Sequence, residues 1–263
     1  MLIGSVKEIG PKFLHGKHQS ERISVGDRIA TLVSLTLTPL IIKKIRKIHL
    51  GLDRVDIEGF AVLFKSGIYS LLPKDVSEHL ALAVLDVCGA PAQTKALCNK
   101  GQTVVVIGGA GKSGLLSMYE AKKQVGAGGK VIGVDYNEAS AKLMKSFSFV
   151  DDVIVADARN AVDMHKRISK VTNGELADLV INVTNIPDTE MSCILSTKPG
   201  GTCYFFSMAT SFTKATLGAE GVGADVRLMM GNGYCPGHAE VSLNILRESL
   251  ELRKFYESKY GQT

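Results

Sequence analysis

The sequence lacks several patterns that would each have assigned it to a special class of protein. It contains no apolar run of about 18 residues uninterrupted by charge, so we expect no membrane span and no membrane partner. Lys7, Glu8 and Lys12 interrupt any apolar core near the N-terminus, which argues against a signal peptide. There is no low-complexity tract, and a composition of 45% hydrophobic and 22% charged residues is typical of a soluble globular protein.

The cysteines are few and scattered. The five residues include no CxxC pair and no Cys/His cluster with metal-ligand spacing, so we expect no disulfide framework and no structural zinc. Reduced cysteines of this kind are typical of intracellular proteins, which predicts a cytoplasmic location. A net charge of +5 spread along the chain indicates a solvated surface, and we expect no nucleic-acid partner.

The chain divides into a β-rich part and a part in which strands and helices alternate. Short strands are expected near residues 3–9, directly after the turn at 25–27, and at 54–57, 60–64 and 68–72. A helix capped by Ser77 follows, with an interruption at Pro91. Beyond it the sequence predicts parallel strands at 103–107, 130–135, 152–155, 179–183, 201–206 and 227–230, and a last helix over 238–256. We therefore expect a Rossmann-type, doubly wound α/β domain over 77–236, a β-rich module over 1–76 and a C-terminal helical segment over 237–263.

The strongest motif is a glycine-rich turn between a strand and a helix. The β-branched strand 103–107 leads into Gly109, Gly111 and Gly114, and a helix is expected over 115–124. In such a turn the first glycine allows the tight bend, the second allows a pyrophosphate to approach the backbone, and the third allows close helix–strand packing. The helix N-terminus adds unpaired N–H groups. The motif predicts a dinucleotide site made of Gly109, Ala110, Gly111, Lys112, Ser113 and Gly114.

A carboxylate ends the next predicted strand. Asp135 can accept hydrogen bonds from both hydroxyls of an adenosine ribose and repels a 2′-phosphate, which favours NAD over NADP, although NADP stays possible. The alternative is that Asp135 only caps the helix expected over 137–145. A second alternative, the phosphate loop of nucleotide triphosphatases suggested by Lys112 and Ser113, requires a glycine where Val106 stands.

Two later strand ends are expected to complete the crevice. Ligands of open α/β sheets bind beyond the carboxyl ends of the strands, so the small polar residues there should flank the ribose and the nicotinamide. Ordinary turn chemistry explains any single one of them equally well. The cofactor residues predicted outside the glycine turn are Asp135, Tyr136, Thr184, Asn185, Ser207 and Met208.

The order of the modules resembles the medium-chain dehydrogenase/reductase superfamily. Its markers here are the turn at Val25–Ile29 (VGDRI) and the glycine pair at Gly200 and Gly201. The longer strings at 26–40, 83–93 and 204–212 resemble, more narrowly, the L-erythro-3,5-diaminohexanoate dehydrogenase family. This resemblance implies an NAD(P)-dependent amino-acid dehydrogenase that acts on a diamino acid in lysine fermentation, forms 5-amino-3-oxohexanoate and releases ammonia. It also implies a GroES-like β-rich module whose first part would precede Met1, and a homodimer.

The catalytic group is the least defined part of the prediction. A substrate ammonium must lose a proton before hydride transfer, which calls for a carboxylate or a histidine. Asp86 is a candidate because it lies in an apolar stretch where a carboxylate needs a partner, and His238 is a second candidate. A buried structural carboxylate and a helix-capping residue explain the two equally well. Two other functions stay open: a zinc-free quinone or enoyl reductase, and a catalytically incomplete NAD-binding or NAD-sensing module.

Overall fold

The computed structural model describes residues 1–11, 13, 22–32, 36, 38–50, 54–231 and 233–261. Residues 33–35, 37 and 232, which fall in segments used above, lie outside this range. The chain forms two compact units: unit 1 comprises Met1–Asp86 with Arg253–Thr263, and unit 2 comprises Val87–Leu252. The domain boundaries expected after residues 76 and 236 stay a prediction.

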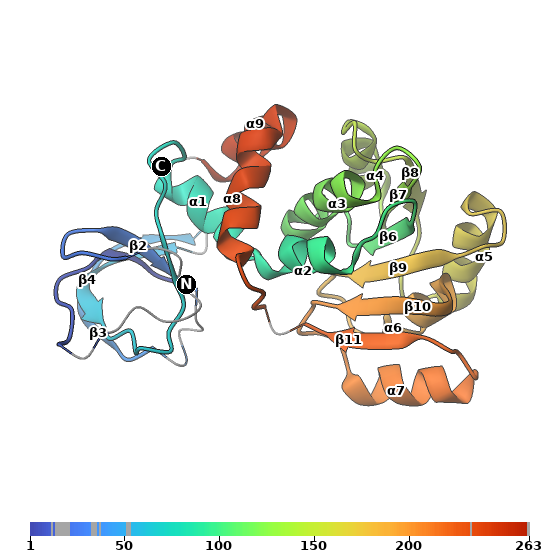
Figure 1. Cartoon of the computed structure of the whole chain (residues 1–263), viewed down its shortest axis with the longest axis horizontal. Helices are drawn as coiled ribbons and strands as arrows, with labels where there is room; N and C mark the ends of the chain where they lie inside the picture. The colour runs from blue at the N-terminus through green and yellow to red at the C-terminus, as the bar shows by residue number, and fades with distance from the viewer. Residues whose placement is uncertain are drawn as a thin grey trace. The chain divides into compact units, whose positions relative to one another are not determined.

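Unit 2 is built on a six-stranded parallel sheet in the order β11-β10-β9-β6-β7-β8 (Figure 1). Four of its strands have the predicted bounds, namely β6 (Thr103–Ile107), β7 (Lys130–Asp135), β8 (Asp152–Val155) and β11 (Arg227–Met230). The other two, β9 (Ala177–Asn182) and β10 (Thr197–Phe205), begin earlier than expected and end one residue earlier. The predicted Rossmann-type α/β class is confirmed.

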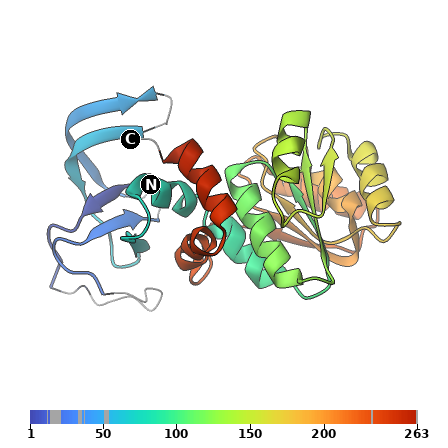
Figure 2. The same cartoon turned by 90° about the horizontal axis from the view of Figure 1, so that it is seen from above.

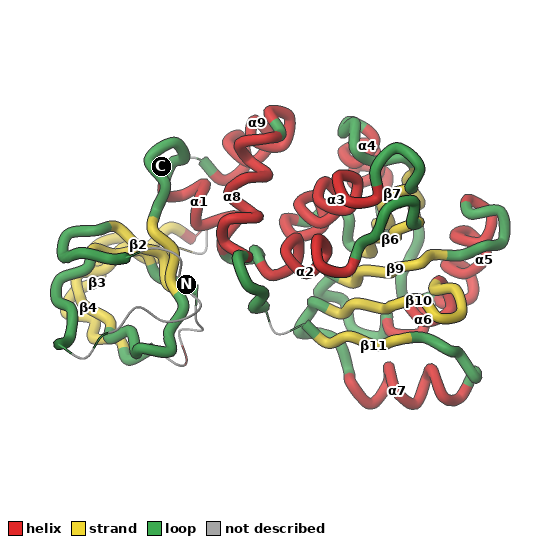
Figure 3. Tube along the Cα trace, viewed as in Figure 1, coloured by secondary structure: helices red, strands yellow, loops and turns green. Residues whose placement is uncertain are grey.

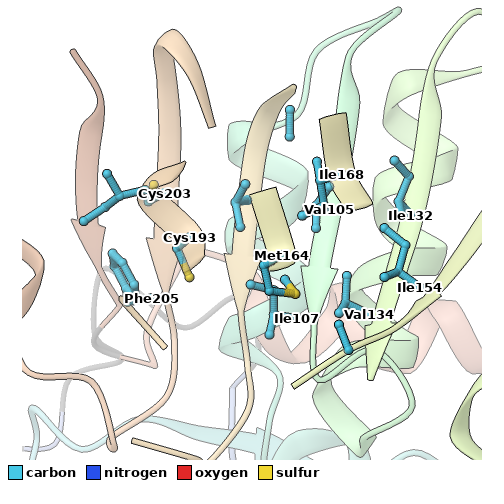
Figure 4. Close-up of a cluster of buried hydrophobic side chains, with 14 of the residues drawn as sticks. Val105, Ile107, Ile132, Val134, Ile154, Met164, Ile168, Cys193, Cys203 and Phe205 are labelled. Carbon is cyan, nitrogen blue, oxygen red and sulfur yellow. The ribbon is translucent and has the colours of Figure 1, made fainter. Parts of the chain in front are cut away.

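Helices cover both faces of this sheet (Figures 1 and 2). One face is covered by α5 (Ala161–Val171), α6 (Glu190–Ser196) and α7 (Phe212–Gly221). The strand residues that pack against these helices alternate along each strand and are buried. Among these strand residues are Ile107, Ile132 and Phe205, which Figure 4 shows beside Met164 and Cys193. The other face carries α2 (Gly89–Leu97), α3 (Lys112–Val125), α4 (Glu138–Lys145) and α8 (His238–Glu248). Burial on both faces explains the continuous apolar runs of the strands.

The strand order reverses at β6. From β6 the chain runs outward through β7 to β8, then returns to β9 on the other side of β6 and continues to β10 and β11. Connections that leave the sheet centre in opposite directions open a crevice at the carboxyl ends of the two central strands. In this sheet those strands are β6 and β9, so the fold places the crevice directly beyond Ile107 and Asn182.

Unit 1 contains a three-stranded antiparallel sheet and a separate hairpin (Figure 3). The sheet has the order β1 (Ile3–Ser5), β2 (Arg28–Thr31), β5 (Tyr69–Leu71), and the hairpin pairs β3 (Leu40–His49) with β4 (Arg54–Ala61). The two strands expected at 54–57 and 60–64 are therefore one strand, and β3 was not expected. Two register shifts in β3, between Ile42 and Lys44 and between Ile45 and Lys47, disturb the two-residue period by which a strand is detected.

Two predicted helix boundaries were wrong. Ser77 caps α1 (Glu78–Leu85) as expected, with its hydroxyl accepting from the N–H of Leu80 at 3.3 Å. The break after α1 comes before Pro91, which lies in the first turn of α2, where a missing N–H removes no helical hydrogen bond. The last helix is divided into α8 and α9 (Leu250–Tyr260) because Ser249 between them has extended backbone angles. None of the helices in the described ranges is long and apolar enough to cross a membrane.

Candidate functional site

The glycine-rich turn lies at the carboxyl end of β6. The N–H groups of Gly108 and Gly109 both donate to the carbonyl of Val134, at 2.9 and 3.1 Å, which ties the turn to neighbouring β7. The N–H of Gly111 donates to the carbonyl of Gly108 at 3.1 Å, and α3 begins at the next residue. The N-cap residue of α3 is Gly111, which has no side chain with which to cap the helix. The N–H groups at the N-terminus of a helix are the donors that a phosphate needs.

The space around each glycine shows which of them the turn requires. A Cβ on Gly114 would lie 2.3 Å from the carbonyl oxygen of Gly108 and 2.5 Å from that of Gly109, so the predicted close packing of helix and turn is present. A Cβ on Gly109 would meet the Sδ of Met144 at 2.6 Å. The left-handed conformation of the tight bend lies one residue before the expected position, at Gly108, with φ +84°. Gly111 is the least crowded, since its Cβ would approach only Gly108 O, at 3.2 Å.

Asp135 lies beside this turn. Its Oδ2 accepts from the N–H of Ala110 at 3.3 Å, and its Oδ1 accepts from the N–H of Tyr136 at 2.9 Å. The cap of α4 is Asn137, whose side chain accepts from the N–H of Ser140 at 2.7 Å. The alternative in which Asp135 only caps that helix is therefore excluded. The half-exposed carboxylate keeps lone pairs with which it can accept from ligand hydroxyls.

The loops after β9 and β10 adjoin the glycine turn, as expected. A Cβ on Gly108 would lie 2.9 Å from the backbone N of Thr184, so the two segments are in contact. The hydroxyl of Ser207 donates to Oδ1 of Asn185 at 3.4 Å and joins the two loops. Tyr136 and Met208 are exposed to 75% and 96%, while Ser113 is buried and Lys112 half-buried. The structure thus brings most of the predicted cofactor residues to one edge of the sheet, and their binding role stays a prediction.

The two catalytic candidates lie in different units. Asp86 follows α1 in unit 1 and is exposed, so the argument from a buried carboxylate does not apply to it. His238 begins α8 in unit 2 and is only 5% exposed, and its burial lowers the pKa of the imidazole. Its ring meets that of Tyr234 edge to face, with centroids 5.2 Å apart. Both assignments stay predictions.

Sequence reasoning missed a set of buried polar residues at the same edge. Asn182 is the last residue of β9, and Thr189 and Glu190 begin α6, yet all three are at most 2% exposed. The amide of Asn182 donates to Oγ1 of Thr189 at 2.8 Å, and Glu190 Oε1 accepts from the N–H of Ser211 at 2.6 Å. The only signal in the sequence is an amide, Asn182, directly after the apolar run of residues 179–181.

Other sites are less suited to a cofactor. Within the described residues no His, Cys, Asp and Glu side chains gather in a way that could hold a metal ion, and the expectation of zinc-free activity stays a prediction. A cavity of about 320 Å³ lies among the amino-terminal ends of the strands, opposite the glycine turn. Its charged groups are already satisfied, because Lys198 pairs with Asp178 and Arg227 donates to the carbonyl of Gly200 at 3.1 Å.

Comparison with known proteins identifies the family. Residues 1–73 match the model of the L-erythro-3,5-diaminohexanoate dehydrogenase N-terminal domain, and residues 114–222 match that of the zinc-binding dehydrogenases. Curated L-erythro-3,5-diaminohexanoate dehydrogenases from Acetoanaerobium sticklandii and Fusobacterium nucleatum are 54% and 50% identical over 260 residues. Each alignment covers 99% of this chain and 74% of the relative. The chain belongs to the L-erythro-3,5-diaminohexanoate dehydrogenase family.

The family is a family of oxidoreductases, and this chain is one of them. Solved structures confirm the medium-chain dehydrogenase fold that was expected. The mycobacterial protein Rv1454c complexed with NADPH is 20% identical, with a TM-score of 0.63 over 98% of this chain and 70% of that one. An alcohol dehydrogenase from Aeropyrum pernix is 16% identical, with a TM-score of 0.63 over 94% of this chain and 71% of that one.

Proposed function

We propose that the chain is an NAD-dependent dehydrogenase that oxidatively deaminates (3S,5S)-3,5-diaminohexanoate to 5-amino-3-oxohexanoate, a step of lysine fermentation. The observation that supports the cofactor is the glycine turn at the N-terminus of α3 with Asp135 beside it. The substrate is inferred from the name of the relatives, which are half identical over almost the whole chain. The overall reaction takes up one NAD and one water, and it releases the ketone, NADH, ammonium and a proton.

The residues of unit 2 fit a dinucleotide. The first turn of α3 would bind the pyrophosphate through backbone N–H groups, and the place of Gly111 in that turn leaves room for a phosphate because no side chain projects from it. The loops that contain Thr184 and Ser207 would border the other half of the molecule. When bound, NAD supplies the nicotinamide ring that accepts the hydride.

Asp135 is our reason for preferring NAD. A carboxylate in this place accepts hydrogen bonds from a ribose diol, whereas the 2′-phosphate of NADP would bring two negative charges beside it. A protein of the same fold is complexed with NADPH, so the fold alone does not select the cofactor. The choice therefore depends on this one side chain and its bonds to Ala110 and Tyr136.

We propose Asp86 and His238 as the groups that take the proton from the substrate ammonium. The lowered pKa of His238 keeps its imidazole neutral near pH 7, and only a neutral imidazole can accept a proton. Asp86 is an exposed carboxylate. Asp86→Asn and His238→Asn should distinguish the two candidates. Substitution of the true proton acceptor should lower kcat/KM without weakening the binding of NAD.

We also propose a homodimer formed through β11. This strand ends the six-stranded sheet, and within the described residues it pairs only with β10. A free strand edge is a common site of association between copies. Light scattering on the purified protein should give twice the mass of one chain, and a monomer at micromolar concentration would contradict this.

The test of function is the appearance of NADH absorbance when protein, NAD and 3,5-diaminohexanoate are mixed. Parallel reactions with NADP, and with quinone and enoyl substrates plus reduced cofactor, distinguish the reductase alternative. Binding of NAD without turnover of any of these substrates would favour the NAD-sensing alternative. If calorimetry detects neither NAD nor NADP on folded protein, the oxidoreductase proposal for this site is refuted.

A further inference from the structure

The loop that follows β10 is anchored at one end by the last residue of β9 and at the other by the first residue of α6. At its start, the N–H of Phe206 donates to the backbone carbonyl of Asn182 at 3.0 Å. At its end, the N–H of Ser211 donates to Oε1 of Glu190 at 2.6 Å. Between these anchors, Ser207 donates to Asn185 and accepts from the N–H of Ala209 at 3.1 Å. The position of residues 207–210 therefore depends on the β9–α6 segment.

Glu190 is an unusual anchor because it is a carboxylate that is only 2% exposed. A buried carboxylate is unfavourable unless hydrogen bonds stabilise its charge, and a bond to a charged acceptor is about twice as strong as a neutral one. The segment that Glu190 belongs to is itself fixed: Asn182 donates to Thr189 at 2.8 Å and accepts from the N–H of Thr184 at 3.3 Å. Because Glu190 is held in a fixed position, its hydrogen bond fixes the backbone of Ser211 as well.

The two halves of a dinucleotide would meet different parts of this edge. The glycine turn follows β6, and Asp135 ends β7 on one side of it. The loops of Thr184 and Ser207 follow β9 and β10 on the other side. A ligand whose adenosine ribose lies at Asp135 and whose pyrophosphate lies at the turn places its nicotinamide half over β9 and β10.

We propose that Glu190 is a positioning residue, which holds the 207–210 loop in the conformation that receives the nicotinamide half of the coenzyme. The inference rests on the proposed NAD site and adds a residue that touches neither coenzyme nor substrate. Its effect is transmitted through the backbone of Ser211. Loss of the carboxylate should therefore weaken binding of the nicotinamide half and leave the adenosine half unaffected.

The experiment compares NAD with ADP, which contains only the adenosine diphosphate half. We expect Glu190→Ala to weaken NAD binding by about 10-fold or more in calorimetry, the loss typical of one hydrogen bond to a charged group, with ADP affinity unchanged within about 2-fold. Glu190→Gln keeps an oxygen that can accept from Ser211 and should recover most of the NAD affinity. Glu220→Ala, an exposed glutamate at the end of α7, is the matched control and should change neither affinity.

Each outcome decides the question. Equal losses of NAD and ADP in Glu190→Ala would show a general structural role and overturn the inference, as would wild-type NAD affinity in that variant. If Glu190→Ala does not fold, Glu190→Asp replaces it, because the shorter side chain keeps a carboxylate that no longer reaches the N–H of Ser211. Equal losses of NAD and ADP in that variant, or wild-type NAD affinity, would overturn the inference. Wild-type protein that binds neither ligand would instead refute the proposed function, so the two failures are distinguishable.

Discussion

The three glycines at 111, 114 and 128 offer a direct test of the cofactor site, because a methyl group would meet a different environment at each. At Gly114 the added Cβ would lie 2.3 Å from a carbonyl oxygen, about 1 Å closer than the 3.3–3.6 Å at which carbon and carbonyl oxygen normally touch. Both nearest groups are backbone, so the turn or α3 must move. Such overpacking typically costs about 1–3 kcal/mol, or roughly 2–12 °C in Tm for a unit of this size.

Gly111→Ala should behave differently. Its Cβ would approach Gly108 O at 3.2 Å, and its φ of −72° and ψ of 169° are available to alanine. We expect a small loss of stability, about 1 kcal/mol or less, from replacing a glycine N-cap by alanine. The methyl group would nevertheless lie where the pyrophosphate must approach the backbone, and NAD affinity should fall by about 100-fold or more.

Gly128→Ala is the control. Nothing lies within 4 Å of the position of its Cβ and its φ is not positive, so alanine should leave NAD binding unchanged and raise the free energy of unfolding by about 0.4–1 kcal/mol. Thermal unfolding gives the Tm of each of the three variants, and calorimetry gives the affinity of each for NAD. Wild-type NAD affinity in Gly111→Ala would refute the reasoning, because a pyrophosphate on this turn cannot tolerate that methyl group.

Three further perturbations test other parts of the molecule. Asp135→Asn keeps an oxygen for the N–H of Ala110 but removes the charge, so the ratio of NADP to NAD affinity should rise by about 10- to 100-fold in calorimetry; an unchanged ratio would remove the basis for choosing NAD. Ser77→Ala removes the cap of α1 and should lower the free energy of unfolding by about 1 kcal/mol in urea titrations, with no effect expected on NAD affinity. Burial raises the pKa of the Cys98 thiol from 9.0 to about 12, so above pH 9 the folded chain retains a proton that the unfolded chain loses, and stability falls as pH rises. From pH 9 to 11 this thiol alone should reduce the free energy of unfolding by about 2–3 kcal/mol, and Cys98→Ala should flatten that decline; an equally steep decline in the variant would contradict the assignment.

The half of the fold that local sequence encodes was predicted well. Strands β6 and β7 are runs of β-branched residues buried on both faces, so their bounds follow from apolar character alone. The glycine turn is a local motif whose parts lie within a few residues of one another. Asp135 could be assigned to the same site because β6 and β7 are parallel neighbours, so their carboxyl ends lie side by side.

The parts that were missed depend on partners far away in the sequence. Strand β3 is stabilised by pairing with β4, and its bulges give an apolar spacing that matches neither strand nor helix. The burial of Glu190 depends on Ser211, which is separated from it by the whole of β10. No pattern within α6 reveals that this acidic residue is inside the protein and its neighbour Asp188 outside.

Asp86 shows how the same limit affects the search for a catalytic group. The residues before it are apolar, and a count of neighbours in the sequence suggests that its carboxylate is buried. In α1 the buried positions are Leu80, Ala81, Val84 and Leu85, which form one helical stripe, and Asp86 falls outside it. The burial of an acidic residue can therefore be inferred only when it is known which residues form the buried stripe of its helix. The glycine turn and Asp135 form a local pattern, so the cofactor can be argued from sequence. Asp86 and His238 belong to no such pattern, and the choice between them has to be made by kinetics on variants of each.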